Sequence, residues 1–441
     1  MKGVKETDIL VVGAGMAGSG AAMYAALATP ASQRFSGTRK SSVTLIDSQP
    51  IVANEWASSC GDSRMYRKMY SDPFYAQMQL QALENWSQVE ALSGEKLLHE
   101  NGLLFYGEET GETVEGSVAG AKETMRQLGI PFEEFSGAEI DAKWKGVRAG
   151  DKPMYEGVFE HTAGHARASA TCNAMVRVAK AHGCEVNLSD GLAELRVVGP
   201  GLVEAVTESG TMYRARRCVL CLGAWTREFF NRKLGLDINL DIWRVHYAHY
   251  EVDRDIAAAG GYPQMFCFRK ERDGGNDGGL YYAFSPSATE TAPGIEDPAA
   301  PPQIKVGVDF KTLLPIDTPA TMDEFDYSPS EYVLNMIEDW VRNNINGTGK
   351  RTSTYVAPYC MAPDPYFVLD RLPETPEILV FAGGQGRAFK FGPLLGECLA
   401  ALALDKEPPM DISKFKITRD GLGLTRIPGI SSVSQRFKSK M

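Results

Sequence analysis

The stretch "DILVVGAGMAGSGAAMYAA" (8–26) constrains the fold of this 441-residue chain more than any other. It reads as a short apolar strand at Ile9–Val12, a turn, and an alanine-rich helix. The turn carries Gly13, Gly15 and Gly18 in the pattern G-x-G-x-x-G. In such a turn the first glycine allows the bend, the second lets the backbone approach a pyrophosphate, and the third lets helix pack on strand. The helix N-terminus then faces the phosphates.

A second apolar segment, "SSVTLIDSQP" (41–50), ends in Asp47 and Ser48. In dinucleotide-binding folds an acid at this point accepts hydrogen bonds from a ribose 2′-hydroxyl, about twenty residues after the glycines. Here about a dozen extra residues intervene, and the Ser, Thr, Gly and Pro content of "TPASQRFSGTRKS" (29–41) predicts a surface loop. The order strand, turn, helix, strand and acid predicts an adenine dinucleotide, and it leaves NAD and FAD both open.

Composition excludes several classes of function. The net charge of −10 at pH 7 argues against nucleic acid as a partner, because phosphate binding needs a basic surface. Residues 10–28 carry no charge over a length that could span a bilayer, but their glycines and alanines make a poor span, so we expect no membrane partner. A single core stops growing at roughly 250–300 residues, so we expect more than one domain.

The eight cysteines show no spacing typical of a metal site. The segment "CVLC" (218–221) has the form C-x-x-C, but it lies in an apolar, strand-like run that favours core packing. We recognise no secretory signal and therefore expect reduced thiols and no metal.

Five blocks follow one another along the chain. They are "VVGAGMAGSGAA", "SSCGDSRMYRKMY" (58–70), "VLCLGAWTREF", "APYCMAPDPYFVLD" and "AGGQGRAFKFGPLLGE". With them the chain resembles the D-amino-acid-oxidase-like flavoproteins, and within these the group of monomeric sarcosine oxidase, N-methyltryptophan oxidase, pipecolate oxidase and fructosyl-amino-acid oxidase. The resemblance covers nearly the whole chain and implies FAD as the cofactor.

The resemblance implies that Cys360 forms a thioether to the 8α-methyl group of the flavin ring. The alternative is a buried thiol that behaves as a small hydrophobic side chain. The cofactor contacts that we expect are spread over all five blocks and the second strand. They are Gly13, Gly15, Met16, Ala17, Gly18, Asp47, Ser48, Arg64, Trp225, Cys360, Met361, Gly384, Gly386, Phe389 and Lys390.

The resemblance also implies that Arg67 and Lys390 hold a substrate carboxylate. An arginine fork grips a carboxylate with two hydrogen bonds and a lysine adds a point charge, so the substrate is expected to be an amino acid. Arg64 is expected to lie over the flavin. On a helix Arg64 and Arg67 would share one face, because they are three residues apart. The alternative for each cation is a solvated surface charge.

Lys305, in "PPQIKVGVDF", matches the family lysine associated with oxygen activation. It is expected mid-strand, with Ile304 and Val306 on the opposite face. A cation near flavin N5 stabilises negative charge as O₂ is reduced. The alternative is a lysine that faces solvent.

Three positions depart from the relatives, which carry histidines there: Cys60, Asp309 and Arg387. These changes argue against sarcosine itself and favour a substrate with a polar or charged side chain. Tyr282 is a further candidate for substrate binding. The segment "WRVHYAHYEVD" alternates as in a strand, and its histidines, His246 and His249, are expected to be structural.

The fold class is expected to be α/β with an α+β substrate domain, of the glutathione-reductase/D-amino-acid-oxidase type. A discontinuous Rossmann-like FAD domain is expected from residues 1–95, 156–235 and 346–441. A mixed-sheet substrate domain is expected from 96–155 and 236–345, with the flavin between the two.

The expected reaction is oxidation of the C–N bond of an amino acid, or of an N-substituted or cyclic one, giving an imine and hydrogen peroxide with O₂ as oxidant. The alternatives are an FAD dehydrogenase with another acceptor and a non-catalytic flavin-binding protein. We expect a monomer. The final Ser-Lys-Met resembles the peroxisomal Ser-Lys-Leu address, which predicts a peroxisomal protein in a eukaryote and a cytoplasmic one otherwise; the alternative is a disordered tail.

Overall fold

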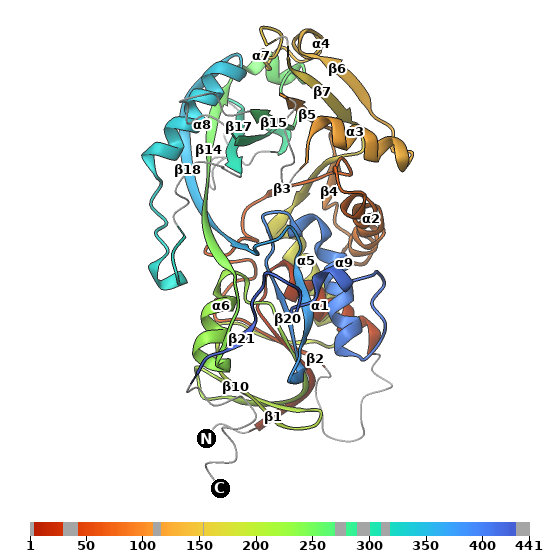
Figure 1. Cartoon of the computed structure of the whole chain (residues 1–441), viewed down its shortest axis with the longest axis vertical. Coiled ribbons are helices and arrows are strands. Elements are labelled where there is room, and N and C mark those ends of the chain that lie inside the picture. The colour runs from red at the N-terminus through yellow and green to blue at the C-terminus, as the bar shows by residue number, and fades with distance from the viewer. Residues whose placement is uncertain are drawn as a thin grey trace.

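The computed structural model describes residues 4–29, 43–108, 116–152, 154–269, 279–288, 300–309 and 318–428. Two eight-stranded sheets organise this part of the chain. In Figure 1 the first sheet lies in the lower part of the molecule and the second in the upper part. Most of the predicted loop at 29–41 and the final Ser-Lys-Met fall outside the described residues.

The first sheet is built around the predicted glycine-turn strand. Its order is β10 (Leu192–Gly199), β11 (Leu202–Thr207), β12 (Met212–Leu220), β1 (Val4–Val12), β2 (Val43–Ile46) and β9 (Glu185–Asn187). Strand β1 runs parallel to β2 and β12. Strand β20 (Thr375–Ala382) pairs with the end of β12, and β19 (Val368–Leu372) pairs with β20. The apolar run that predicted a buried strand is therefore a central strand of this mixed sheet, with a parallel neighbour on each side.

Helices α1 (Met16–Ala28), α5 (Ala168–Ala181) and α9 (Gly392–Ala403) pack together on this sheet. Helices α1 and α9 touch at Gly20 and Gly396. A Cβ added at Gly396 would lie 2.5 Å from the carbonyl carbon of Gly20, so the small residues set this close approach. No helix among the described residues is long and apolar enough to cross a membrane, and the uncharged stretch at 10–28 is instead split between β1 and α1.

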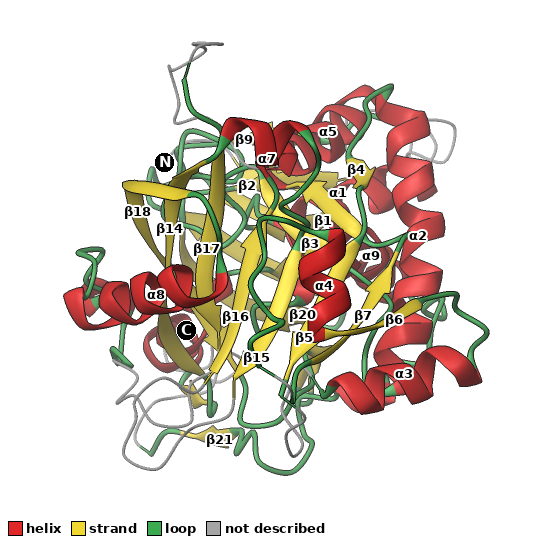
Figure 2. Ribbon diagram, turned by 90° about the horizontal axis from the view of Figure 1, so that it is seen from above, coloured by secondary structure: helices red, strands yellow, loops and turns green. Residues whose placement is uncertain are grey.

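The second sheet carries the predicted mid-chain strands. Its order is β18 (Thr348–Met361), β14 (Asp241–Val252), β17 (Gln303–Asp309), β16 (Gly279–Phe284), β15 (Met265–Arg269), β5 (Leu103–Gly107), β7 (Glu156–Glu160) and β6 (Glu133–Ser136). Helix α8 (Glu331–Asn344) lies across β14 and β17 (Figure 2). Trp340 of this helix stacks on Tyr281 of β16, with ring centroids 5.1 Å apart.

Smaller elements join the two halves. Strands β3 (Ser63–Tyr66), β8 (Gly164–Arg167) and β4 (Leu98–Glu100) form a three-stranded sheet, and β13 (Leu236–Asp237) pairs with β21 (Thr425–Arg426). The remaining α-helices of the described residues are α2 (Pro73–Ser93), α3 (Val118–Gln127), α4 (Gly137–Lys143), α6 (Thr226–Phe229) and α7 (Arg254–Ala258). Short helical turns include η2 (Gly223–Trp225) and η6 (Ala388–Phe391).

The shared helix face proposed for Arg64 and Arg67 is wrong. Arg64 lies on strand β3, and Arg67 directly follows that strand. Residues 63–66 pair antiparallel with β8, and helix α2 begins only at Pro73. Along an extended chain an odd offset turns two side chains to opposite faces, so these arginines point different ways.

The domain boundaries stay a prediction. Two strands within the segments assigned to the FAD domain, β7 and β18, hydrogen-bond in the second sheet. Strand β18 is long, and in Figure 1 it runs with β14 from the second sheet toward the first. The end of β18 therefore brings residues from the second sheet to the glycine turn.

Candidate functional site

A cavity of about 350 Å³ opens beside the turn between β1 and α1. Its walls come from that turn, from residues 47–64, from the end of β12 with η2, from the end of β18, and from the turn between β20 and η6. Predicted cofactor contacts that line it are Gly13, Gly15, Met16, Ala17, Asp47, Ser48, Arg64, Trp225, Cys360, Gly384, Gly386 and Phe389. Gly18, Met361 and Lys390 are described by the structure but are not among the lining residues.

The glycine turn is as tight as the sequence pattern requires. Gly13 has φ +102°, and a Cβ added there would lie 2.3 Å from the Cys221 carbonyl oxygen. A Cβ at Gly18 would lie 1.8 Å from the oxygen of Gly13, so helix and turn are in contact at this position. The N–H of Met16 donates to Ser59 Oγ at 3.1 Å. The first turn of α1 thus meets the cavity, where its dipole favours phosphate.

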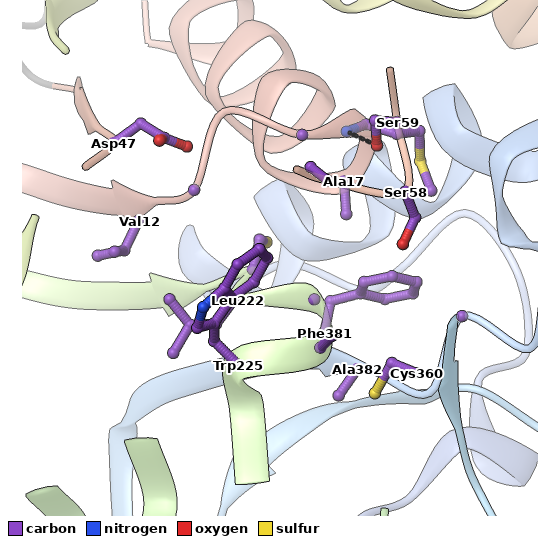
Figure 3. Close-up of a pocket in the computed structure, with 18 of the residues that line it drawn as sticks. Val12, Ala17, Asp47, Ser58, Ser59, Leu222, Trp225, Cys360, Phe381 and Ala382 are labelled. Carbon is purple, nitrogen blue, oxygen red and sulfur yellow. Dashed lines mark hydrogen bonds between the residues drawn. The ribbon is translucent and has the colours of Figure 1, made fainter. Parts of the chain in front are cut away.

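Asp47 lies at one end of the cavity, and Cys360 lies at the other (Figure 3). Asp47 Oδ2 accepts the Ala14 N–H at 2.6 Å, and its Oδ1 accepts the Gln49 N–H at 2.8 Å. Burial raises the pKa of this carboxyl, and the two backbone bonds oppose the shift. The acid therefore holds the glycine turn as well as facing the space where a ribose would lie.

Cys360 comes from the end of β18, where it pairs with Ile242 of β14. Its side chain is buried and unbonded to any other cysteine, and the Gly383 N–H donates to its Sγ at 3.4 Å. Burial raises the pKa of this thiol to about 11, although the Gly383 N–H favours the thiolate. A thiol at the far end of the cavity from Asp47 fits the isoalloxazine end of an FAD.

Lys305 and Arg64 meet beside this end of the cavity. Lys305 Nζ donates to Ser63 O at 3.0 Å and to Ser63 Oγ at 2.5 Å, and Arg64 Nη1 donates to the same carbonyl at 2.9 Å. The ammonium of Lys305 lies 4.1 Å from the Phe284 ring centroid. Lys305 is 7% exposed, so a solvent-facing lysine is excluded, while Ile304 and Val306 pack under α8 as the alternation predicts.

Arg64 also holds the preceding loop, residues 58–60, in place by hydrogen bonds to its backbone. Its Nη2 donates to the carbonyls of Ser58 and Cys60 at 2.8 and 2.5 Å, and its guanidinium carbon lies 5.9 Å from the Phe389 ring centroid. The arginine lines the cavity and so serves both the loop and the cofactor space.

Three buried cations gather around the ring pair Tyr70 and Tyr75, whose centroids are 5.6 Å apart. Arg67 lies 4.4 Å and Lys390 5.7 Å from the Tyr70 ring centroid. Arg387 lies 5.1 Å from that of Tyr75. A cation over an aromatic face is held by the ring quadrupole even where water is excluded. The structure thus brings together the three cations proposed to bind substrate.

The other candidates have simpler surroundings. The ring of Tyr282, on β16, packs against Gly307 of β17. A Cβ added at Gly307 would lie 2.3 Å from the Tyr282 ring. Cys60 is half-buried, with its thiol 3.6 Å from the Glu55 oxygen, and is not among the residues that line the cavity. The backbone of Asp309 ends β17 and pairs with Leu280.

Several lining residues were not predicted. They are Gln49, Asn54, Ser58, Ser59, Glu208, Leu222, Tyr359 and Phe381, among others. Ser58 and Ser59 open the block "SSCGDSRMYRKMY", and their place beside the arginines was the available signal. Glu208 lies outside all five blocks, so none of these patterns pointed to it.

This two-sheet architecture, with a glycine turn for a pyrophosphate, an acid for a ribose and buried cations at the opposite end, defines a dinucleotide-binding protein. The chain belongs to the DAO family, FAD dependent oxidoreductases, whose family model matches residues 8–402. Its cofactor is therefore FAD, and the glycine cradle and Asp47 fit that group.

Among curated proteins the chain is similar to monomeric sarcosine oxidase from Bacillus sp. (strain NS-129), 29% identical over 94% of this chain and 97% of that protein. It is also similar to N-methyl-L-tryptophan oxidase from Yersinia pestis (strain Pestoides F), 26% identical over 93% and 99%. The fold matches that of NikD, an unusual amino acid oxidase essential for nikkomycin biosynthesis, with a TM-score of 0.76, 23% identity and coverage of 93% and 97%. It also matches fructosamine oxidase (Amadoriase II) from Aspergillus fumigatus, with a TM-score of 0.69, 18% identity and coverage of 94% and 90%.

Proposed function

We propose that this FAD-dependent enzyme oxidises the C–N bond of an amino acid, or of an N-substituted or cyclic amino acid, to an imine. The observation that carries the proposal is the gathering of Arg67, Lys390 and Arg387 around Tyr70 and Tyr75, near a second pair of cations at the flavin end of the cavity. When bound, FAD would act as the two-electron acceptor for the amine, and O₂ would reoxidise it and be reduced to hydrogen peroxide.

Arg67 and Lys390 are proposed to bind the substrate carboxylate. Arg67 offers a planar fork and Lys390 a compact charge, and both are buried, so a carboxylate between them would be held in one orientation. That orientation would present the C–H bond next to nitrogen to the flavin. Water hydrolyses the imine afterwards, and no protein base is required when the amine binds deprotonated.

Arg387 is proposed to select the side chain. It is 1% exposed and lies over Tyr75, next to the two carboxylate-binding residues. The similarity to oxidases of sarcosine and N-methyl-L-tryptophan supports an amine substrate. A third cation in this place favours a substrate whose side chain is acidic or strongly polar over sarcosine itself.

Lys305 is proposed to favour O₂ as the electron acceptor. Its ammonium is buried and fixed by Ser63, so it is preorganised toward negative charge that develops on oxygen. A dehydrogenase with another acceptor is the rival, and slow reoxidation of the reduced enzyme by O₂ would favour it.

Cys360 is proposed to attach the flavin covalently. The thioether would replace the S–H bond of Cys360 and one C–H bond of the 8α-methyl group, and O₂ would accept the two electrons and two protons. The support is the position of the thiol in the cavity wall, opposite Asp47.

Anaerobic mixing of the enzyme with a panel of primary, N-methyl, cyclic and acidic amino acids tests the function. Bleaching of the flavin absorbance by at least one of them is expected, and bleaching by none contradicts the proposal.

Size-exclusion chromatography tests the proposed monomer. The proposed peroxisomal address is tested by a reporter that bears the last residues of the chain, which should leave the cytosol of a eukaryotic cell.

A further inference from the structure

Glu160, the last residue of β7, is a carboxylate with no exposed surface beside the segment that follows Arg67. Its Oε2 accepts two backbone hydrogen bonds, from the N–H of Lys68 at 2.8 Å and from that of Met69 at 3.2 Å. Its Oε1 lies 2.7 Å from Lys68 Nζ and accepts from Thr162 Oγ1 at 3.4 Å. One carboxylate therefore ties down two successive peptide groups.

The Lys68 side chain completes this arrangement. Its side chain is 6% exposed, and its ammonium also donates to Thr162 Oγ1 at 2.6 Å. Removing two charges from water costs about as much as their attraction returns, so a buried ion pair adds little net stability. The ion pair is therefore more important for the position of the backbone than for the net stability. The pair fixes where the backbone at 68–69 lies relative to the second sheet.

The same short segment carries Arg67. Arg67 Nε donates to the carbonyl of Met69 at 3.2 Å, and the guanidinium carbon lies 4.4 Å from the ring centroids of both Tyr70 and Phe266. Phe266 belongs to β15 and Glu160 to β7, and both strands pair with β5. The second sheet thus supplies both the Phe266 ring that packs against Arg67 and the Glu160 carboxylate that accepts hydrogen bonds from the backbone after Arg67.

We propose that Glu160 is a positioning residue for substrate binding, which fixes the peptide groups of Lys68 and Met69 so that Arg67 presents its fork in one place. This inference rests on the carboxylate-binding role proposed for Arg67. A misplacement of about 1 Å in an active site can lower the rate roughly a hundredfold, and binding groups must likewise be held close to their productive geometry. The hydrogen bonds from Glu160 to the backbone beside Arg67 should therefore affect how tightly Arg67 binds a carboxylate.

Two double variants separate the effect of the two backbone hydrogen bonds to Glu160 from that of its ion pair with Lys68. Glu160→Gln with Lys68→Met removes both charges but keeps one carbonyl oxygen that can accept both N–H bonds. Glu160→Leu with Lys68→Met has the same charge and a similar volume but no acceptor. Acetate is the probe, titrated against the flavin absorbance of each holoenzyme, with acetamide as the uncharged control. We expect the glutamine pair to bind acetate within about threefold of the unmodified enzyme, and the leucine pair to bind it roughly 10- to 100-fold more weakly with flavin content unchanged.

Equal acetate affinity in the two double variants would overturn the inference and leave Glu160 as a structural ion-pair partner. Amide hydrogen exchange of the unmodified holoenzyme gives a second measurement that needs no variant. The amides of Lys68 and Met69 should exchange slowly, and exchange as fast as in an exposed loop would also overturn it, even if the leucine pair fails to fold. A panel in which no amine reduces the flavin contradicts the proposed function, while acetate binding and exchange still judge Glu160.

Discussion

Lys305 and Arg64 donate hydrogen bonds to the same atom, the backbone oxygen of Ser63, at 3.0 and 2.9 Å. Lys305 stands 242 residues further along the chain than Ser63 and reaches it from β17 of the second sheet. A shared acceptor fixes the separation of the two cations. Removing one charge should therefore change the electric field at this end of the cavity without freeing the other side chain.

Lys305→Met should separate the two half-reactions. Reduction of the flavin by substrate under anaerobic conditions should stay largely intact, because no anion forms near Lys305 in that step. Reoxidation by O₂ should slow by roughly 10²–10³-fold, about 3–4 kcal/mol, as when one preorganised charge is lost. Stopped-flow absorbance measures both rates. Lys305→Arg should recover part of the rate, and Lys350→Met, whose side chain is 74% exposed on β18, is the control. Unchanged reoxidation in Lys305→Met would exclude this role.

Cys360→Ser should release the flavin from the denatured chain. After acid precipitation the yellow colour and fluorescence should stay with the unmodified protein and leave the variant. Cys398→Ser is a matched control, because Cys398 is also buried but lies on α9 rather than in the cavity wall. Free flavin from the unmodified protein would show that the attachment does not form.

The rate of flavin attachment should depend on pH. Burial raises the pKa of Cys360 to about 11, so the thiolate is ~10⁻⁴ of the population at pH 7 and grows about tenfold per pH unit. Incubation of flavin-free protein with FAD should therefore give attachment rates that rise from pH 7 to pH 10. The rate is read from protein-bound fluorescence after denaturation. A rate that is flat over this range would mean that the thiolate is not the attacking form.

Lys390→Met should weaken substrate binding far more than flavin binding. Loss of one charge-assisted hydrogen bond costs about 1.5–3 kcal/mol, or one to two decades in affinity. The substrate Kd from anaerobic titration of the flavin spectrum measures the effect, and flavin content per chain is measured alongside. Lys414→Met is the control, because Lys414 also lies over aromatic rings, at 4.5 Å from that of Phe74, but its side chain is 40% exposed. An unaltered Kd would remove Lys390 from the binding site.

The stability of the protein should fall in mild acid because of His249. Burial lowers the pKa of His249 to about 4, the charge of Lys305 adds to the shift, and the ring lies 2.8 Å from Ser353 Oγ. The unfolded chain, with a pKa near 6.5, binds the proton first, so the free energy of unfolding decreases as pH is lowered from 6.5 to 4, by on the order of 3 kcal/mol.

Urea unfolding from pH 7 to pH 4 measures this dependence. His249→Gln should have the shallower slope, because the buried imidazole no longer titrates. Equal slopes for His249→Gln and the unmodified protein would mean that folding does not lower the pKa of His249.

Local features were predictable from the sequence because short-range sterics and periodicity decide them. The spacing of Gly13, Gly15 and Gly18 encodes a turn that a Cβ would block, and the turn is found as predicted. The alternation around Lys305 assigned its side chain to the face opposite Ile304 and Val306, because successive side chains of a strand point to opposite faces. The strands of the mid-chain segment followed from the same rule.

The orientation of Arg64 and Arg67 was not predictable in this way. Their spacing suits a helix face, but pairing of β3 with β8, about a hundred residues distant, holds them in an extended segment and turns them apart. Burial of the cations likewise depends on partners from other elements. Lys305 needs Ser63, and Arg67 needs Phe266.

The sequence by itself therefore determined the cofactor cradle, since the turn, helix and acid that form it lie within one stretch of chain and obey local rules. Tertiary structure decided the substrate side, including the carboxylate of Glu160 behind the Lys68 and Met69 peptides. Those contacts join residues about ninety positions apart or more, and pairing between distant strands, which no local pattern encodes, brings them together.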